Sequence, residues 1–403
     1  MATTASGTGL DCADGVLDEL ARMGDERGVL SLFAATGAET GMRHGPGADE
    51  IALRGKIDAL REAVRREGPR QRWSLLEDRL GELQPEIAGL TDASLPGRGH
   101  ALFAPLSGGP ARTVSCADPL PALAVLAATA YMRPLLAPLD AARPAGIVAV
   151  SATGVRAVDW REGRAEDVVT MTFDDESGEW RRMKGPASSN PGQSMQMASQ
   201  RDLFERRLRE HRKRYVSGCA SELVEAAEAR GWERLLLAGM PELTRALSAE
   251  TSGRVPTLEG GAVPRAEISA QDLATALAPA LDQAREEEHR QKAALVRDAA
   301  LSTQGTATLG LDDTLAALAE GRVHELLLDT QREVAGVVSA DGRLARRGQV
   351  PPGVAPGTLQ AEPHLVERMI ERAFETGAGV VPLATMAADV LDDWDRVAAR
   401  LRW

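Results

Sequence analysis

The feature that most constrains this chain is residues 181–215, which read RRMKGPASSNPGQSMQMASQRDLFERRLREHRKRY. Residues 185–193 consist mainly of Gly, Pro, Ser and Asn and offer no large apolar side chain to a core. This composition predicts an exposed, mobile loop. Residues 200–215 then predict a helix with abundant arginine. The rest of the chain must therefore fold so that this loop and helix lie outside its hydrophobic core.

The same stretch is strongly basic. It has ten basic and three acidic residues, a net charge of +7, whereas the whole chain carries −12. A positive island on an acidic protein favours contact with a polyanion, and the alternative is a solvated helix face. Arginine suits the first reading because it can pair with phosphate through two parallel hydrogen bonds. The ten basic residues are Arg181, Arg182, Lys184, Arg201, Arg206, Arg207, Arg209, Arg212, Lys213 and Arg214.

Length and composition limit the class of protein. A chain of 403 residues, 43% hydrophobic and 26% charged, is typical of a soluble protein with several domains. The sequence contains no apolar run of about 20 residues for a membrane span and no secretory signal at its start. Cys12, Cys116 and Cys219 are too far apart for a metal site or a disulfide framework. We therefore expect a cytoplasmic protein with no metal, no cofactor, no membrane partner and no DNA partner.

The first part of the chain, residues 1–142, predicts an α/β domain. Residues 28–35 read as a buried strand, and two amphipathic helices follow, separated at Gly68-Pro69. Residues 97–103 read as a turn that leads into a strand, in which His100 is a packed or surface residue rather than a ligand. Residues 119–139 combine Ala and Leu with several prolines, which predicts a broken helix or a mixture of strand and loop.

A boundary at Arg143-Pro144 opens a central domain, residues 143–291. Strands are predicted at residues 146–150, 155–160 and 168–173, a helix at 220–230 and a further strand at 235–239. A helix begins near Gln271, and Pro279 should kink it. The charged run at residues 286–292 is predicted to be a solvated helix face.

The remaining residues, 292–403, predict an α/β/α sandwich. A helix begins near residue 311 with Asp312 or Asp313 as its cap and closes at Gly321, and a strand follows at residues 326–328. Residues 342–361 read as a Pro- and Gly-rich loop, residues 365–375 as a helix and residues 380–381 as a strand. The chain is predicted to end as a helix at residues 397–403.

Several segments together resemble a known family. The order of Lys184-Gly185, Pro191-Gly192-Gln193-Ser194 and a basic helix ending at Arg214-Tyr215 resembles domain two of the archaeal and eukaryotic class-I release factors. Residues 235–239 (LLLAG) resemble a later strand of that domain, and residues 310–329 (GLDDTLAALAEGRVHELLLD) resemble the opening of domain three. The end of the chain, residues 394–403, is also similar. The resemblance covers roughly residues 146–403 and is closest to the bacterial branch of that superfamily.

The resemblance implies a fold and a set of partners. It implies three α/β domains, the second RNase-H-like with a protruding loop at residues 185–194 and without a nuclease metal site. The third would be an α/β/α sandwich similar to kink-turn-binding ribosomal proteins. The implied activity is that of a tRNA-shaped ligand of the ribosomal A site, whose partners are rRNA of the peptidyl-transferase centre, peptidyl-tRNA and a translational GTPase. The ten basic residues above would then bind rRNA.

The resemblance also implies catalytic residues, Gly192 and Gln193. In the family, a glutamine beside the peptidyl-tRNA ester positions water, and a backbone N–H stabilises the developing oxyanion. Here Pro191 replaces the first glycine of the family's Gly-Gly-Gln, and proline fixes φ and has no N–H. The N-terminal part also lacks the Asn-Ile-Lys-Ser and Tyr-x-Cys stop-codon motifs. The resemblance therefore implies a factor that binds stalled or idle ribosomes without reading a codon. Peptidyl-tRNA hydrolysis would occur only if the chemistry can proceed with Pro191 in place of the first glycine.

Two alternatives remain open from the sequence. One is a non-catalytic ribosome hibernation factor that protects the peptidyl-transferase centre. The other is an RNA- or protein-binding module unrelated to the ribosome. No Ser-His-Asp or Cys-His set stands out as a rival catalytic centre.

Overall fold

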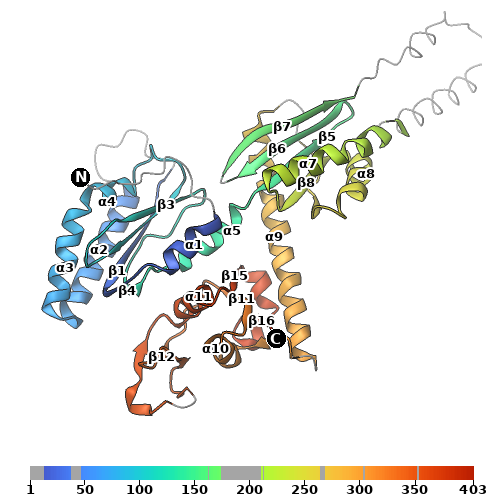
Figure 1. Cartoon of the computed structure of the whole chain (residues 1–403). Helices are drawn as coiled ribbons and strands as arrows, with labels where there is room; N and C mark the ends of the chain where they lie inside the picture. Colours follow the sequence, from blue (N-terminus) through green and yellow to red (C-terminus); the bar gives the residue numbers. More distant parts are fainter. Residues whose placement is uncertain are drawn as a thin grey trace, which may run out of the picture. The chain divides into compact units, whose positions relative to one another are not determined.

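A computed structural model describes residues 13–37, 47–161, 163–173, 210–211, 213–263, 268–302, 305–351 and 354–403. The chain is a mixed α/β protein of several sheets, so the predicted fold class is confirmed (Figure 1). It divides into two compact units. Unit 1 combines Met1–Ala142 with Arg285–Trp403, and unit 2 is Arg143–Ala284. The helix that carries the 284/285 division also contains the 291/292 boundary expected from the sequence, and three separate domains remain a prediction.

The N-terminal part of unit 1 is a four-stranded antiparallel sheet in the order β3-β2-β1-β4. Alternation along β1 sends Leu30 and Leu32 to the face covered by α2 and α3, and Val29 and Phe33 to the opposite face, which packs with α5. The predicted strand and the helical pair are confirmed, whereas residues 119–139 form a strand followed by a helix rather than a broken helix or a mixture of strand and loop. The elements are α1 (Ala13–Ala21), β1 (Gly24–Ala35), α2 (Ala48–Glu67), α3 (Arg70–Glu82), α4 (Gln84–Gly89), β2 (Gly99–Pro105), β3 (Arg112–Cys116), β4 (Leu123–Thr129) and α5 (Arg133–Ala141).

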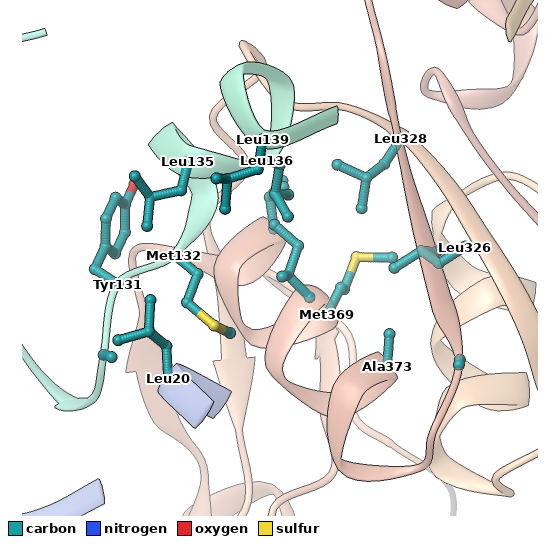
Figure 2. Packing of buried hydrophobic residues seen from close by; sticks show 14 of the residues in the cluster. Leu20, Tyr131, Met132, Leu135, Leu136, Leu139, Leu326, Leu328, Met369 and Ala373 are labelled. Atoms are coloured by element: carbon teal, nitrogen blue, oxygen red, sulfur yellow. The ribbon is translucent and has the colours of Figure 1, made fainter. Parts of the chain in front are cut away.

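The C-terminal part of unit 1 is a sandwich around a second sheet, in the order β10-β16-β11-β15. Leu326 and Leu328 pack with α10 and α11, while Leu327 packs with α12 and the end of α9, so helices cover both faces. Figure 2 shows Leu326 and Leu328 in one cluster with Met369 and with residues of α5. The main elements are α9 (Ala270–Leu301), β10 (Ala307–Leu309), α10 (Leu311–Ala319), β11 (Val323–Asp329), α11 (Leu365–Glu375), β15 (Gly379–Leu383), α12 (Thr385–Asp389) and β16 (Val397–Leu401).

Three predictions for this part are wrong. Residues 397–401 form strand β16, because they pair with both β10 and β11 in the centre of the sheet. Residues 342–361 contain β13 (Leu344–Arg346), a short 3-10 helix at Pro356–Thr358 and part of β14 (Gln360–Glu362), and both strands pair with β12 (Gly336–Val338). The start of α10 has Gly310 as its N-cap, with φ +80 and no side-chain cap, while Asp312 lies near Arg346 instead.

Unit 2 is built on a five-stranded sheet in the order β7-β6-β5-β8-β9. β5, β6 and β7 are antiparallel, whereas β8 runs parallel to β5 and β9. Helices α7 and α8 cover one face, and the first turns of α9 cover the other through Leu273 and Leu277. The elements are β5 (Ala145–Val150), β6 (Gly154–Arg161), β7 (Arg164–Thr172), α7 (Ala220–Arg230), β8 (Arg234–Gly239), α8 (Pro241–Thr251) and β9 (Thr257–Glu259), followed by α9, which continues through Pro279. The predicted strands and the predicted helix at residues 220–230 are confirmed.

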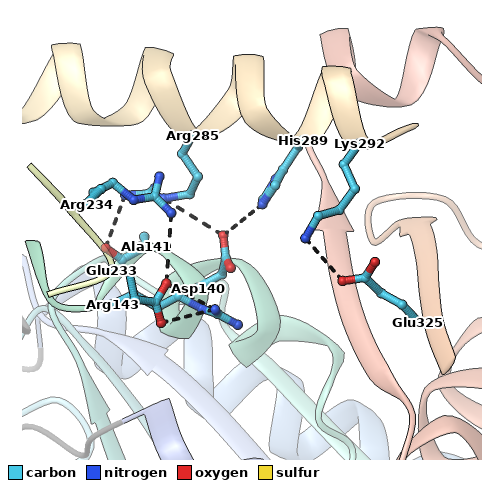
Figure 3. A network of polar contacts seen from close by, with 9 residues as sticks. All are labelled: Asp140, Ala141, Arg143, Glu233, Arg234, Arg285, His289, Lys292 and Glu325. Atoms are coloured by element: carbon cyan, nitrogen blue, oxygen red, sulfur yellow. Dashed lines mark hydrogen bonds and ion pairs between the residues drawn. The ribbon is translucent and has the colours of Figure 1, made fainter. Parts of the chain in front are cut away.

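The charged run of α9 has the predicted solvated face, with Glu287, Glu288, Arg290 and Gln291 exposed, but the side of the helix that carries His289 makes specific contacts. His289 is buried, and its Nε2 lies 3.4 Å from Oδ2 of Asp140 (Figure 3). Arg285 donates to the carbonyl oxygen of Ala141 at 3.2 Å, and Lys292 pairs with Glu325 at 3.1 Å. These contacts, all within unit 1, give the run specific partners that a helical charge pattern does not reveal.

Candidate functional site

The part of unit 2 that adjoins the predicted site residues is the base of the segment between β7 and the helix that leads into α7. The tip residues Gly192 and Gln193 lie outside the described residues, as does the expected loop at residues 185–194. The same holds for eight of the ten basic residues: Arg181, Arg182, Lys184, Arg201, Arg206, Arg207, Arg209 and Arg212. The structure therefore locates the two ends of this segment, and the roles expected for its tip remain predictions.

The two ends meet in a small aromatic cluster, which we call the neck: Thr172, Phe173, His211 and Tyr215. The Tyr215 hydroxyl donates a hydrogen bond of 2.8 Å to the carbonyl oxygen of Thr172. The Phe173 ring packs edge to face against Tyr215, with ring centroids 5.3 Å apart, and against His211 at 6.4 Å. Partial burial raises the pKa of Tyr215, so this hydroxyl keeps its proton and remains a donor. The neck thus joins the end of β7 to the returning helix.

The helix at residues 213–218 places the two described basic residues beside the neck. Lys213 and Arg214 are both exposed, directly before Tyr215. Lys213 also lines a groove of about 480 Å³ along α8, together with Arg245, Glu210 and Glu242. Because this groove has as many acidic as basic side chains, its charge does not by itself favour a polyanion.

The next turn of this helix anchors the neck to the core. Val216 and Cys219 are buried and pack in the cluster that includes Leu223 of α7 and Leu235 of β8. Burial raises the pKa of the Cys219 thiol, and its Sγ donates to the Tyr215 carbonyl at 3.3 Å. A protonated, buried thiol is a poor nucleophile, so Cys219 is a packing residue.

A second hollow lies at the carboxyl ends of β5 and β8, which run parallel to each other. It measures about 360 Å³ and is lined by Ala149, Val150, Ser151, Ala152, Gly239, Met240, Pro241, Ala262 and Val263. Ligands commonly bind at such a position in α/β sheets. None of these lining residues is acidic or basic, however, so the hollow offers no ligand set for a cation and no counter-charge for phosphate. Across the described residues, no group of three His, Cys, Asp or Glu could hold a metal ion.

Several other buried polar residues have structural partners. In unit 2, Asp159 accepts a hydrogen bond of 2.6 Å from the Trp232 indole, and Arg230 lies 3.2 Å from the same carboxylate. In unit 1, His100 is fully buried with Nδ1 3.1 Å from the Ser115 hydroxyl, and burial lowers its pKa. Of the two positions expected for His100, packed or on the surface, the structure shows the packed one. Among the described residues, no helix is long and apolar enough to cross a membrane.

A comparison with family models found a match over the central part of the chain. Residues 131–286 match the model of bacterial archaeo-eukaryotic release factor family 10. This range contains all of unit 2 from Arg143 to Ala284, the neck and the residues between its two ends. A search of curated proteins found no significant match.

Solved structures show more distant likenesses. An archaeal translation termination factor, aRF1, is 16% identical, with 96% of each chain covered and a TM-score of 0.23. Pelota from Archaeoglobus fulgidus is 11% identical (75% of this chain, 79% of that chain, TM-score 0.35). Dom34 from S. cerevisiae is 10% identical (76% and 79%, TM-score 0.35). Structural similarity at these TM-scores is too low to support a conclusion about the fold or function of this chain. The family match over residues 131–286 confirms the predicted resemblance to the bacterial branch of the archaeo-eukaryotic release factors.

Proposed function

We propose that this protein is a translation factor that binds the A site of stalled or idle ribosomes without reading a codon. The observation that carries the proposal is the family match over the segment that contains Pro191-Gly192-Gln193. In this proposal the segment reaches the peptidyl-transferase centre, and the ten basic residues around it contact rRNA. A translational GTPase as a partner of the C-terminal part and a cytoplasmic location belong to the same proposal.

The neck supports the proposal because it joins the two ends of the segment. The hydrogen bond of 2.8 Å from Tyr215 to Thr172 and the ring contact with Phe173 give the segment a defined origin on the sheet. Lys213 and Arg214 are exposed beside that origin, where phosphate groups can reach them. Hydrolysis of the peptidyl-tRNA ester would then depend on Gln193, which would position water, and on the backbone N–H groups of Gly192 and Gln193.

A release assay tests this function. Ribosomes carrying labelled peptidyl-tRNA and an empty A site are incubated with the protein, with Gln193→Ala or with the matched control Gln196→Ala from the same segment. Peptide release by the parent and the control, lost at least tenfold in Gln193→Ala while ribosome binding is unchanged, supports a hydrolase. Binding without release by any of the three supports the hibernation factor. Absence of binding to ribosomes from both growing and starved cells contradicts the proposal.

The contribution of the basic helix needs a separate measurement. Reversal of three arginines to glutamate (Arg206, Arg207 and Arg209) should weaken ribosome binding and reduce its dependence on salt, because fewer phosphates would be neutralised. Co-sedimentation that persists unchanged after this reversal would exclude the helix as the rRNA contact.

A further inference from the structure

The strongest unexplained feature of unit 1 is a pair of buried glutamates on α11. Glu367 is 2% exposed and Glu371 is 5% exposed, one helical turn apart. A buried carboxyl group costs free energy unless its oxygens find hydrogen-bond donors. The donors here come from a segment more than two hundred residues earlier in the chain, residues 129–133, which we call the strap. The strap joins β4 of the N-terminal sheet to α5.

The Glu367 carboxyl group binds the backbone of the strap. One carboxyl oxygen accepts the Met132 N–H at 2.6 Å, and the other accepts the Arg133 N–H at 3.0 Å. These two groups lie at the start of α5, where backbone N–H groups have no partner within the helix. Glu367 therefore replaces the cap that the strap's own side chains do not provide, since Met132 at the N-cap position makes no side-chain cap.

The Glu371 carboxyl group binds a side chain of the same strap. It accepts a hydrogen bond from the Thr129 hydroxyl, and its other oxygen accepts one of 2.6 Å from Arg368. Arg368 in turn donates to Glu362 at 2.9 Å. The two glutamates thus bind both ends of the strap, and Glu371 has a cation beside it.

Apolar packing runs alongside these polar contacts. A single buried cluster contains Phe33 of β1, Leu135 of α5, Met369 of α11 and Leu328 of β11. Figure 2 shows Tyr131 and Met132 of the strap beside α5, in the same cluster as Met369. Hydrophobic contact alone would join the two parts, but it is non-directional. Buried carboxylates with defined donors add a fixed register at some cost in stability.

We propose that Glu367 and Glu371 form a latch that fixes the strap on α11, so that the N-terminal sheet and the C-terminal sandwich of unit 1 act as one body. Because the strap leads into α5, which ends directly before Arg143, the latch would also fix the element from which the chain enters unit 2. The latch does not depend on the proposed function, since it involves contacts within unit 1 alone.

The latch should respond to pH, because burial raises the pKa of its central carboxyl. Burial raises the pKa of Glu367 to about 8, and Glu371 on its own helix raises it further, while the strap amides and the Arg133 guanidinium oppose the shift. Other ionisable groups nearby are Tyr131 on the strap, Arg368 and Glu362 around Glu371, and Glu333 and His364, which face Arg133 and Tyr131. Because the folded-state pKa is raised, the contribution of Glu367 to stability is full below its ordinary pKa of 4.5 and is lost as pH rises to about 8.

Hydrogen exchange on the full-length chain tests the latch. Glu367→Gln replaces one of the two acceptor oxygens by a donor amide that cannot accept a strap N–H, and Thr129→Val removes the hydroxyl that donates to Glu371. Glu375→Gln is the matched control, since Glu375 lies on the same helix in an exposed pair with Arg372. We expect both latch variants to raise exchange at residues 130–141 about tenfold or more, while β1, β11 and the control remain unchanged. If Glu367→Gln fails to fold, Thr129→Val alone still tests the latch, because this variant removes only the donor to Glu371.

Two outcomes would refute the proposed latch. Exchange at residues 130–141 equal to that of the control would show that the carboxyls do not hold the strap. Equal loss of protection across the strap, β1 and β11 would show that these residues only support the core. For the parent, protection of the strap corrected for intrinsic exchange should fall as pH rises from about 6 to about 8, and Glu367→Gln should remove this dependence. A pH response that is the same in both proteins would refute the role of the Glu367 proton.

Discussion

The neck gives the sharpest prediction for unit 2, because two substitutions at Tyr215 remove different contacts. Tyr215→Phe removes only the hydroxyl that donates to Thr172. A hydrogen bond of this kind contributes about 0.5–1.5 kcal/mol, and the low end applies here because the neck is partly exposed and water can replace the donor. Tyr215→Ala also removes the edge-to-face contact with Phe173, which adds about 0.5–1.5 kcal/mol beyond its buried area.

These magnitudes predict a graded response. Opening of the neck should become about two- to fivefold easier in Tyr215→Phe and about thirtyfold easier in Tyr215→Ala, as measured by hydrogen exchange of the peptide that covers residues 164–173. The control is Tyr131→Phe, which alters the other tyrosine of the chain, in unit 1, and should leave this peptide unchanged. Equal exchange in the parent and in Tyr215→Ala would refute the reasoning that these contacts close the neck.

The other predictions concern stability. Gly146→Ala would place a Cβ 2.4 Å from a ring carbon of Trp232 in the core of unit 2, so we expect a loss of about 1–3 kcal/mol in urea unfolding. Gly55→Ala, in a helix where an added Cβ meets nothing within 4 Å, should instead stabilise by about 0.5–1 kcal/mol, and equal effects of the two would contradict the packing argument. Because the folded-state pKa of Glu367 is raised to about 8, its ionisation removes on the order of a few kcal/mol of unfolding free energy as pH rises from about 4.5 to 8. Glu367→Gln should flatten that part of the pH profile of urea unfolding, and an unchanged profile would count against it.

The sequence predicted elements well where local signals agreed with tertiary packing. The helix at residues 220–230 is followed by Gly231, whose φ of +66 suits only a residue that tolerates the left-handed region. The helix at residues 365–375 has a sharply divided apolar face, with Met369 and Ile370 fully buried. In both cases the local sequence pattern agrees with the buried core.

The errors arose where partners distant in sequence decided the outcome. Residues 397–401 contain two alanines, an arginine and a leucine, which favour a helix, yet pairing on both sides with β10 and β11 makes them a central strand. Likewise, Asp312 has the residue type and position of a cap, but Arg346 from a later strand is its neighbour. Pairings of this kind cannot be read from a local window of sequence.

For the candidate site, too, local features of the sequence were informative and long-range contacts were not. The sequence pointed to Tyr215 and the basic residues before it through their order along the chain, and their role in binding stays a prediction. The contact of Tyr215 with Thr172, across a gap of about forty residues, was not predicted, because it depends on where β7 ends in the folded sheet. The only advance signal was the presence of aromatic residues on both sides of the loop, Phe173 and Tyr215.

Because of the position of β7 in the sheet, substitutions at the tip residues should affect chemistry without affecting the stability of unit 2. β7 is the edge strand in the order β7-β6-β5-β8-β9, so the chain can leave it at Thr172 and return at His211 without interrupting a pairing between two inner strands. Changes at the tip should therefore leave the unfolding of unit 2 nearly unchanged. Pro191→Gly would restore the Gly-Gly-Gln order of the resembling family and free the backbone from a fixed φ. If Pro191 limits hydrolysis, this variant should release peptide from ribosomes at least tenfold faster than the parent at equal binding and equal stability. A release rate no higher than that of the parent would show that Pro191 is not the restraint, and a large loss of stability would contradict the separation argued from the edge strand.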